Sequence, residues 1–469
     1  ETRNDWNGAV TNYGALAQFY PDRVDFVTSL ARAEVGAGNA GEAIAVLEAA
    51  QARPQSDWDH MRLDLVESYA YARRSEVARS LEVARDAERI AARLGARVAL
   101  ADAVLTQAHS HQRDGHLDES EALFKRARAI YVEVSDADNV LHCDAGLGEL
   151  AVLRGDLDQA FALEERVVAG YRAAGNTYRT ARELTSLCLL QASAGHLQKA
   201  RDLSDEGAKL FEQAHDHEGV AYGLLNQAEL DLAMGHLDGV GERLAQGRAL
   251  QASVGQKAGV AEADLAKARL AWTEGRATEA DASLETALHE GAESGDASLA
   301  AEIALERALV AFERGSATEA ASFEEASRRV AAVPDVRLKA LVDVLAARRA
   351  LRAGDVSTAR ARAESAEAQA RRAHAPDAIA LALAAGLDAA AEGETRETKR
   401  AELSTTAPEL EALEPKVVGL LALARAARGE EAIAWASRAL KVAKAGGAVP
   451  LERSAGQELA KLGRGGAGR

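Results

Sequence analysis

Histidine and cysteine are the residue types in this chain whose side chains could do chemistry, so their spacing comes first. His109, His111 and His116 form one group, and His215 and His217 form a second. Metal ligands that share a helix face are three or four residues apart, whereas residues two apart point in different directions. The histidine spacing therefore argues against a metal site.

The cysteines give no better signal for catalysis. Cys143 stands between His142 and Asp144, which could suggest an activated thiol, but adjacent residues on a helix diverge by about 100°. Cys188 is best interpreted as a packing residue. The chain has no phosphate-binding glycine loop, no dinucleotide-binding motif and no nucleophile elbow. We therefore expect no catalytic residues, no cofactor and no enzymatic activity.

Composition favours a chain built from many helices. Of the 469 residues, 48% are hydrophobic but only 4% are aromatic, so alanine and leucine supply most of the apolar surface. The net charge of −17 argues against binding to nucleic acid or anionic membranes and favours a basic ligand. Two cysteines exclude a disulfide scaffold, and no apolar run is long enough to span a bilayer. These features predict a cytoplasmic protein.

Glycines recur with a period of forty residues. Because glycine readily adopts the left-handed conformation that ends a helix, each forty-residue unit is expected to be two antiparallel helices. The principal series is Gly115, Gly155, Gly195, Gly235, Gly275 and Gly315, continued at Gly354 and Gly393. A second series lies halfway between its members, at Gly95, Gly175, Gly255 and Gly295.

Small residues recur in the same period on both sides of these glycines. Side chains of this size allow the helices of a hairpin to approach closely. Seven residues before each principal glycine stand Ala108, Gly148, Cys188, Ala228, Ala268, Ala308, Ala347 and Gly386. Five residues after a unit's glycine stand Ala43, Ala160, Ala200, Ala280, Ala320 and Ala359.

This combined pattern resembles the tetratricopeptide repeat, and Phe124 fits the aromatic place of that family. The unit is about six residues longer than the usual 34, like the long-helix variety found in large bacterial signalling proteins. The resemblance implies an all-α, right-handed superhelical solenoid of about ten antiparallel hairpins. The expected parts are residues 1–24 (the end of a preceding repeat or a cap), 25–409 (the solenoid), 410–462 (a terminal repeat with capping helices) and 463–469 (a disordered tail).

Stacked hairpins of this kind present their first helices on a concave face, which suits a peptide or a partner's helix. Aromatic residues and arginines there would be natural anchors, although each residue is equally compatible with solvated or packing roles. With the family's geometry, the inward positions propose a partner-binding set: His109, Arg113, Glu149, Arg182, Tyr222, Asn226, Glu229, Arg269, Trp272 and Phe312.

The function expected from the resemblance is a non-catalytic scaffold that binds a protein or peptide partner. It is similar to the repeat regions that follow a serine/threonine kinase or winged-helix DNA-binding domain in bacterial regulators, and since the chain begins with Glu1, such a domain is expected upstream. No nucleic acid or membrane is expected to bind this region. The alternative is a regulator whose solenoid changes pitch when a ligand or peptide binds.

One basic stretch stands out in the acidic chain. It is either a dock for an acidic partner or a solvated face whose charges are paired with neighbouring glutamates. Its members are Arg348, Arg349, Arg352, Arg360, Arg362, Arg371 and Arg372.

Overall fold

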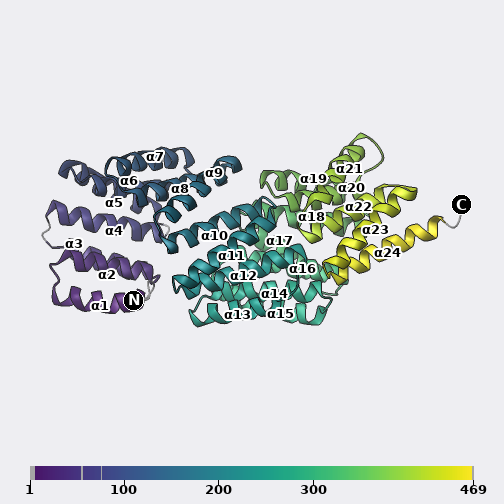
Figure 1. Ribbon diagram of the computed structural model, residues 1–469, viewed down its shortest axis with the longest axis horizontal. Coiled ribbons are helices and arrows are strands. Elements are labelled where there is room, and N and C mark those ends of the chain that lie inside the picture. Colours follow the sequence, from purple (N-terminus) through teal and green to yellow (C-terminus); the bar gives the residue numbers. More distant parts are fainter. Residues whose placement is uncertain (1–5, 54–55, 75, 467–469) are drawn as a thin grey trace. The chain divides into compact units, whose positions relative to one another are not determined.

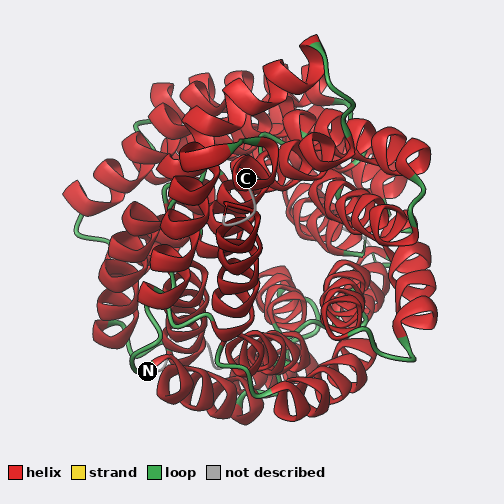
Figure 2. Ribbon diagram, turned by 90° about the vertical axis from the view of Figure 1, so that its right-hand side faces the viewer, coloured by secondary structure: helices red, strands yellow, loops and turns green. Residues whose placement is uncertain are grey.

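The computed structural model describes residues 6–53, 56–74 and 76–466 of the chain. Within those ranges every regular element is helical, and short turns join the helices (Figure 2). The all-α class expected from the sequence is confirmed. The chain forms two compact units, Glu1–Glu183 (unit 1) and Leu184–Arg469 (unit 2). Their boundary lies within one helix, α10 (Thr177–Ser193).

Unit 1 begins with a single helix that packs on the first of a series of antiparallel hairpins (Figure 1). The first helix of each hairpin has an even number and the second an odd number. Its helices are α1 (Trp6–Phe19), α2 (Val24–Gly36), α3 (Ala40–Gln51), α4 (Asp57–Arg73), α5 (Val77–Leu94), α6 (Arg97–Arg113), α7 (Leu117–Glu133), α8 (Ala137–Arg154), α9 (Leu157–Ala173) and the start of α10.

Unit 2 continues the same hairpin plan to the end of the chain. Its helices after α10 are α11 (Leu197–Gln213), α12 (His217–Met234), α13 (Val240–Ser253), α14 (Lys257–Thr273), α15 (Ala277–Ser294), α16 (Ala297–Arg314), α17 (Glu319–Ala331), α18 (Val336–Ala353), α19 (Val356–Arg372), α20 (Pro376–Ala389), α21 (Glu394–Thr406), the 3₁₀ helix η1 (Ala407–Glu409), α22 (Leu413–Ala426), α23 (Gly429–Ala445) and α24 (Val449–Gly466).

The glycines of both periodic series end helices as predicted, except Gly393, which has a φ of +141° and stands directly before α21. From Gly115 to Gly354 the principal glycines have φ between +61° and +84°, and the four halfway glycines lie between +66° and +75°. At Gly155 the turn is closed by bonds from Gly155 N–H to the Val152 carbonyl and from Asp156 N–H to the Ala151 carbonyl. These bonds satisfy carbonyls that the end of α8 would otherwise leave unpaired.

The gaps in the halfway series are filled by residues with side chains in the same left-handed conformation. Ser135, His215 and His374 have φ of +58°, +54° and +50°. The sequence pattern misses these turns because none of the three residues is glycine. A side chain there costs about 1 kcal/mol because its Cβ approaches the following carbonyl.

Replacing Ser135 or His215 by glycine should therefore stabilise the protein by about 0.5 to 1 kcal/mol each. Urea denaturation of the variants S135G and H215G, one in each unit, measures the change. A loss of stability in both would show that their side chains support the turns rather than strain them.

Small residues line the contact between the two helices of each hairpin. Ala108, Ala228 and Ala308 are completely buried, and Phe124 is completely buried at its aromatic place. The five-after alanines are buried too, with the exception of Ala320, which is exposed. Because α17 begins two residues late relative to the forty-residue period, Ser322 occupies the buried place instead.

Within unit 2 the last helices return to pack against earlier ones, α22 against α12 and α24 against α14. The turns at Gly235 and Gly275 lie in this contact. A Cβ atom on Gly235 would stand 2.8 Å from the Gly446 Cα, and one on Gly275 would stand 2.9 Å from Val449 Cγ1. Here glycine is required both by its positive φ and by the close approach of another helix pair.

Alanine at Gly235 should therefore cost more than alanine at Gly315, where φ is also positive but nothing lies within 4 Å of the added Cβ. Both variants carry the left-handed penalty of about 1 kcal/mol, and only G235A adds overpacking of about 1 to 3 kcal/mol. Chemical denaturation of G235A and G315A gives the difference. Equal losses would contradict the packing of α22–α24 on this turn.

At the chain ends the expected division stays a prediction, apart from the tail. The described residues of segment 1–24 hold α1 and the first residue of α2, and residues 410–462 hold α22, α23 and most of α24. The tail expected at 463–469 is helical as far as Gly466, because α24 continues past its packed residue Ala455. Residues 467–469 lie outside the described part of the chain, as do residues 1–5, 54–55 and 75.

Candidate functional site

In unit 1, the four proposed residues lie on the first helices α6, α8 and α10. His109 is half-buried, with its ring edge-on to Phe124 at 4.9 Å and 5.4 Å from the ring of His142. Burial lowers the pKa of both histidines to about 4. The pair is therefore uncharged at neutral pH, which favours a packing role over anion binding.

The charged members of this set also make contacts within the protein. The Arg113 guanidinium donates to the Ala72 carbonyl, which links α6 to the end of α4. Glu149 accepts a bond of 2.9 Å from the Gln112 side chain, which links α8 to α6. Arg182 is exposed on α10.

In unit 2, five of the six proposed residues keep part of their surface accessible. Tyr222, Asn226 and Glu229 are half-buried on α12, and Arg269 and Trp272 are half-buried on α14. Phe312 differs from the accessible position expected for it and is a correction to the proposed set. Its side chain is only 3% exposed and belongs to the core between α16, α17 and α18. Arg348 and Arg352 stack over its ring, so Phe312 has no free face for a partner.

Arg269 joins three successive first helices. Its guanidinium lies 2.8 Å from Glu302 and 2.9 Å from Glu306 on α16, and 3.8 Å from Glu229 on α12. The structure thus brings together Glu229 and Arg269 from the proposed set. It adds Glu302 and Glu306, which the repeat positions had not singled out.

Beside this group lies a cavity of about 240 Å³ in unit 2. Four consecutive first helices and the residues that begin them, α12, α14, α16 and α18, supply its walls. Its lining includes five carboxylates and a few apolar or small side chains: Glu229, Glu262, Leu265, Asp296, Ser298, Leu299, Glu302, Asp335 and Leu338.

Negative charge is incompletely compensated in this cavity. Burial raises the pKa of Glu262 to about 7, and the neighbouring carboxylates of Glu229 and Glu302 raise it further in the same direction. Burial likewise raises the pKa of Glu229 to about 6, although Arg269 opposes the shift. Among the described residues Glu262 has no hydrogen-bond or ion-pair partner, so the cavity wall holds an ionisable carboxylate without a cation beside it.

A further carboxylate approaches the same group from the last helices. Glu414 on α22 keeps an exposed surface, but desolvation by the surrounding protein and the charge of Glu306 on α16 raise its pKa to about 7. Arg348 and Arg269 lower the pKa of Glu414. Glu414 is thus influenced by the Arg269 group, although it is not among the residues that line the cavity.

Buried aspartates paired with arginines form a second set of charges, which the sequence analysis missed. Asp144 bonds to Arg128 at 2.7 Å and to Arg166 at 2.9 Å, so three helices share one carboxylate that is 1% exposed. Asp264 pairs with Arg248 and Asp343 with Arg362, and each of these pairs joins two helices. Their spacing, together with Asp64, follows multiples of about forty residues, and this recurrence is the signal that could have found them.

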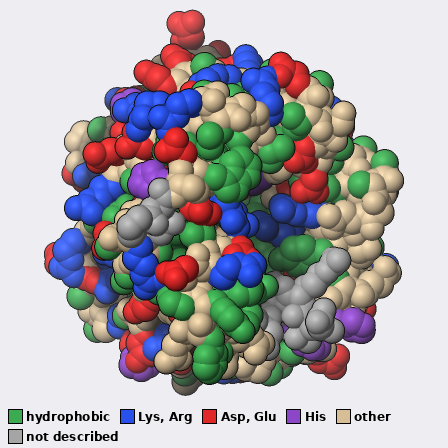
Figure 3. All heavy atoms as spheres, turned by 90° about the vertical axis from the view of Figure 1, so that its left-hand side faces the viewer, with side chains coloured by type: hydrophobic (Ala, Val, Ile, Leu, Met, Phe, Trp, Pro, Cys, Tyr) green, Lys and Arg blue, Asp and Glu red, His purple; other side chains and the backbone are tan. Residues whose placement is uncertain are grey.

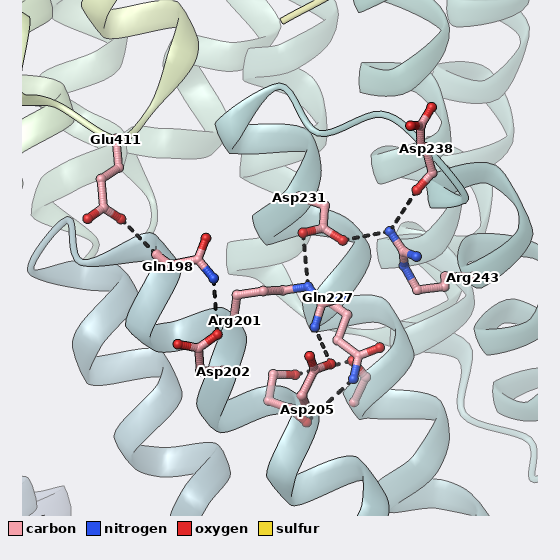
Figure 4. A network of polar contacts seen from close by, with 11 residues as sticks. Gln198, Arg201, Asp202, Asp205, Gln227, Asp231, Asp238, Arg243 and Glu411 are labelled. Atoms are coloured by element: carbon pink, nitrogen blue, oxygen red, sulfur yellow. Dashed lines mark hydrogen bonds and ion pairs between the residues drawn. The ribbon is translucent and has the colours of Figure 1, made fainter.

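Asp231 shows how such a carboxylate holds neighbouring helices (Figure 4). It accepts bonds from Arg201 on α11 at 2.9 Å and from Arg243 on α13 at 2.6 Å. Nearby, the Gln198 backbone N–H at the start of α11 donates to Glu411 at 2.7 Å, a bond between residues far apart in the chain. These contacts are structural and leave no obvious ligand position.

The basic stretch of residues 348–372 is likewise engaged within the protein. Arg349 bonds to Glu319 at 2.8 Å, Arg362 to Asp343 at 2.8 Å, and Arg371 to Glu402 at 2.7 Å. These partners lie mostly on adjacent helices rather than one turn away, so the stretch ties repeats together. On the face shown in Figure 3, acidic and basic side chains are also interspersed rather than separated.

Comparison with known proteins bears on the fold. Residues 100–173 match the family model of the tetratricopeptide repeat. The apo form of RapI has a TM-score of 0.56 and 9% identity, covering 75% of this chain and 98% of that one. Aspartyl phosphate phosphatase F from Bacillus subtilis has a TM-score of 0.52 and 13% identity, covering 70% and 92%. Residues 100–173 thus match the repeat family, and the fold of the chain is that of a tetratricopeptide-like helical solenoid. A comparison with curated proteins found no significant match.

The remaining candidate groups of this tetratricopeptide-like protein offer little chemistry. Burial raises the pKa of Cys143 to about 12 and that of Cys188 to about 11, which suppresses the reactive thiolate. In the described ranges no group of three or more histidine, cysteine or acidic side chains is placed to hold a metal ion. Among the described helices none is long and apolar enough to cross a bilayer.

Removing Arg269 should destabilise unit 2, because Glu229, Glu302 and Glu306 would lose their shared cation. We expect R269A to lower the free energy of unfolding by about 1 to 2 kcal/mol. The loss should be larger at pH 8 than at pH 5, since the three carboxylates repel one another only when ionised.

Urea denaturation at both pH values tests this expectation. R276A is the matched control, because Arg276 is more exposed and pairs only with its near neighbours Glu274 and Glu279. A pH-independent loss in R269A, no larger than that in R276A, would contradict the role given to Arg269.

Proposed function

We propose that unit 2 of this tetratricopeptide-like protein binds a basic, extended segment of a partner protein along its first helices. The observation that carries the proposal is the carboxylate-lined cavity at Glu229, Glu262 and Glu302, in which Glu262 has no cationic partner among the described residues. A lysine or arginine side chain would supply the missing positive charge. The net charge of −17 favours the approach of such a segment over long range.

The cavity's size supports a side chain of a larger partner rather than a small molecule. Its volume of about 240 Å³ falls below the roughly 300 Å³ at which small-molecule pockets begin. Because four successive helices contribute to the walls, an occupant that follows them must be elongated. Tyr222, Asn226 and Trp272 remain proposed contacts beside the cavity, where aromatic and amide groups would pack against the segment's backbone.

A binding assay with defined peptides tests the proposal. Fluorescence anisotropy should show that a labelled peptide of alternating arginine and alanine binds the full chain, whereas its glutamate–alanine counterpart does not. The double variant E229Q/E262Q should weaken binding of the basic peptide about tenfold, equivalent to about 1.4 kcal/mol. In the unaltered chain the affinity should rise between pH 6 and 8, as Glu229 and Glu262 lose their protons.

The matched control is E242Q/E324Q, which removes the same charge from two exposed glutamates on the second helices α13 and α17. It should leave the affinity within twofold of the unaltered chain. An equal loss of affinity in both double variants would show that the peptide is attracted by the overall charge of the chain. That result would overturn the proposed site.

A second candidate function is a regulator whose pitch changes on binding. It is favoured by the position of Glu414, which lies on a returning helix yet is influenced by the Glu306 and Arg269 charges. A ligand that neutralises this group would stabilise the packing of α22–α24 on the earlier helices. Small-angle scattering with and without the basic peptide would support this function if the radius of gyration falls on binding.

We also propose that the repeat region serves a larger cytoplasmic signalling protein, on the strength of its resemblance to repeat regions of bacterial regulators. The coding sequence that precedes Glu1 tests this role. A kinase or DNA-binding domain encoded there would support it, and a coding sequence that starts at Glu1 would overturn it.

A further inference from the structure

Glu164 in unit 1 is an acidic residue at a core position of the repeat. It lies on α9 and is only 5% exposed. Four residues separated from it by multiples of forty lie on other second helices, and all four are uncharged and buried: Phe124, Ser204, Leu244 and Leu284. At the same spacing Glu324 carries a charge, but it is exposed on α17, which begins late.

The Glu164 carboxyl group presses against α8 without a polar partner. Its Oε1 atom occupies space left by the small residue Gly148, since a Cβ there would lie 2.8 Å away. Its Oε2 atom is buried and has no hydrogen bond. A buried carboxylate in this state would lack the compensation that proteins normally provide, whereas a neutral carboxylic acid costs much less to bury.

The charges that face Glu164 do not supply that compensation. Glu149 on α8 and Glu183 on α10 are both acidic and disfavour its ionisation. The nearby arginines compensate other carboxylates. Arg166 on α9 forms an ion pair with Asp144. The charges of Arg179 and Arg182 on α10 lower the pKa of Glu183. On the same helix Glu165 is exposed.

We propose that Glu164 is a proton-operated switch in the packing of unit 1. In its neutral form the side chain fills the space beside Gly148 and holds α9 against α8. When it ionises, the buried charge draws water or leaves the core, and this layer of helices loosens. The device is independent of the binding function proposed for unit 2.

The direction of the pH effect follows from linkage. Burial raises the pKa of Glu164 to about 8, with Glu183 and Glu149 adding to the shift. The proton therefore binds more tightly in the packed layer than in an opened one, where the ordinary glutamate pKa near 4.3 applies. Protection of the layer should fall as pH rises through neutrality and level off above about pH 8, the reverse of the usual glutamate behaviour.

Native-state hydrogen exchange of the full chain, read by mass spectrometry and corrected for intrinsic rates, tests the switch. Between pH 6.5 and 9, amides of α8 and α9 should lose protection by about thirtyfold in the unaltered chain. The variants E164Q and E164L should lose less than threefold, the second because leucine holds the same place at Leu244 and Leu284. E165Q, which changes the exposed neighbour, should behave like the unaltered chain.

Amides of α19 in unit 2 serve as the internal reference and should not change. The proposal is overturned if α8 and α9 keep their protection at pH 9, or if E164Q and E164L lose as much as the unaltered chain. It is also overturned if α19 loses protection in parallel, because the pH effect would then be general. The proposal is supported if E165Q loses amide protection like the unaltered chain while E164Q and E164L keep theirs.

Discussion

The structure depends on turns that reverse the chain after about every sixteen residues with one residue in the left-handed conformation. Glycine makes this conformation nearly free of strain, and its recurrence at forty residues sets the hairpin length. Once the lengths match, small residues at matched places let helices approach closely, as at Ala108 and Ala228. Where a turn also meets another pair of helices, as at Gly235, the absence of a side chain is required a second time.

Charge compensation is the second organising feature. The aspartates of the Asp144 and Asp231 type are buried because arginines from adjacent helices reach them, and each pair therefore links elements that the apolar core alone would hold less specifically. Against this background, two carboxyl groups without a cationic partner among the described residues carry the proposals made above. Glu262 in unit 2 lines a cavity open to a ligand, and Glu164 in unit 1 lies in the core. A carboxyl group without a cationic partner is thus the basis of the binding site proposed in unit 2 and of the proton switch proposed in unit 1.

Much of the fold could be predicted from the sequence because the glycine and alanine series report local requirements that recur. The turns at Ser135 and His215 were missed since their left-handed residues carry side chains and therefore do not appear in a glycine pattern. The packing position predicted for Ala320 was wrong because α17 starts two residues late. The candidate site was predicted less well. Repeat positions identified Glu229 and Arg269, but burial of Phe312 and the part played by Glu262 and Glu414 depend on packing between helices distant in sequence.

The central claim, that a basic segment occupies the carboxylate-lined cavity of unit 2, is tested most directly by site-specific photo-crosslinking in source cells. A photoreactive amino acid at Ser298, which lines the cavity, is compared with one at the exposed Glu324 on α17. The account predicts that Ser298 crosslinks to short segments rich in lysine or arginine and that Glu324 does not. Crosslinks from both positions to the same proteins, or from Ser298 to acidic or apolar segments alone, would contradict it.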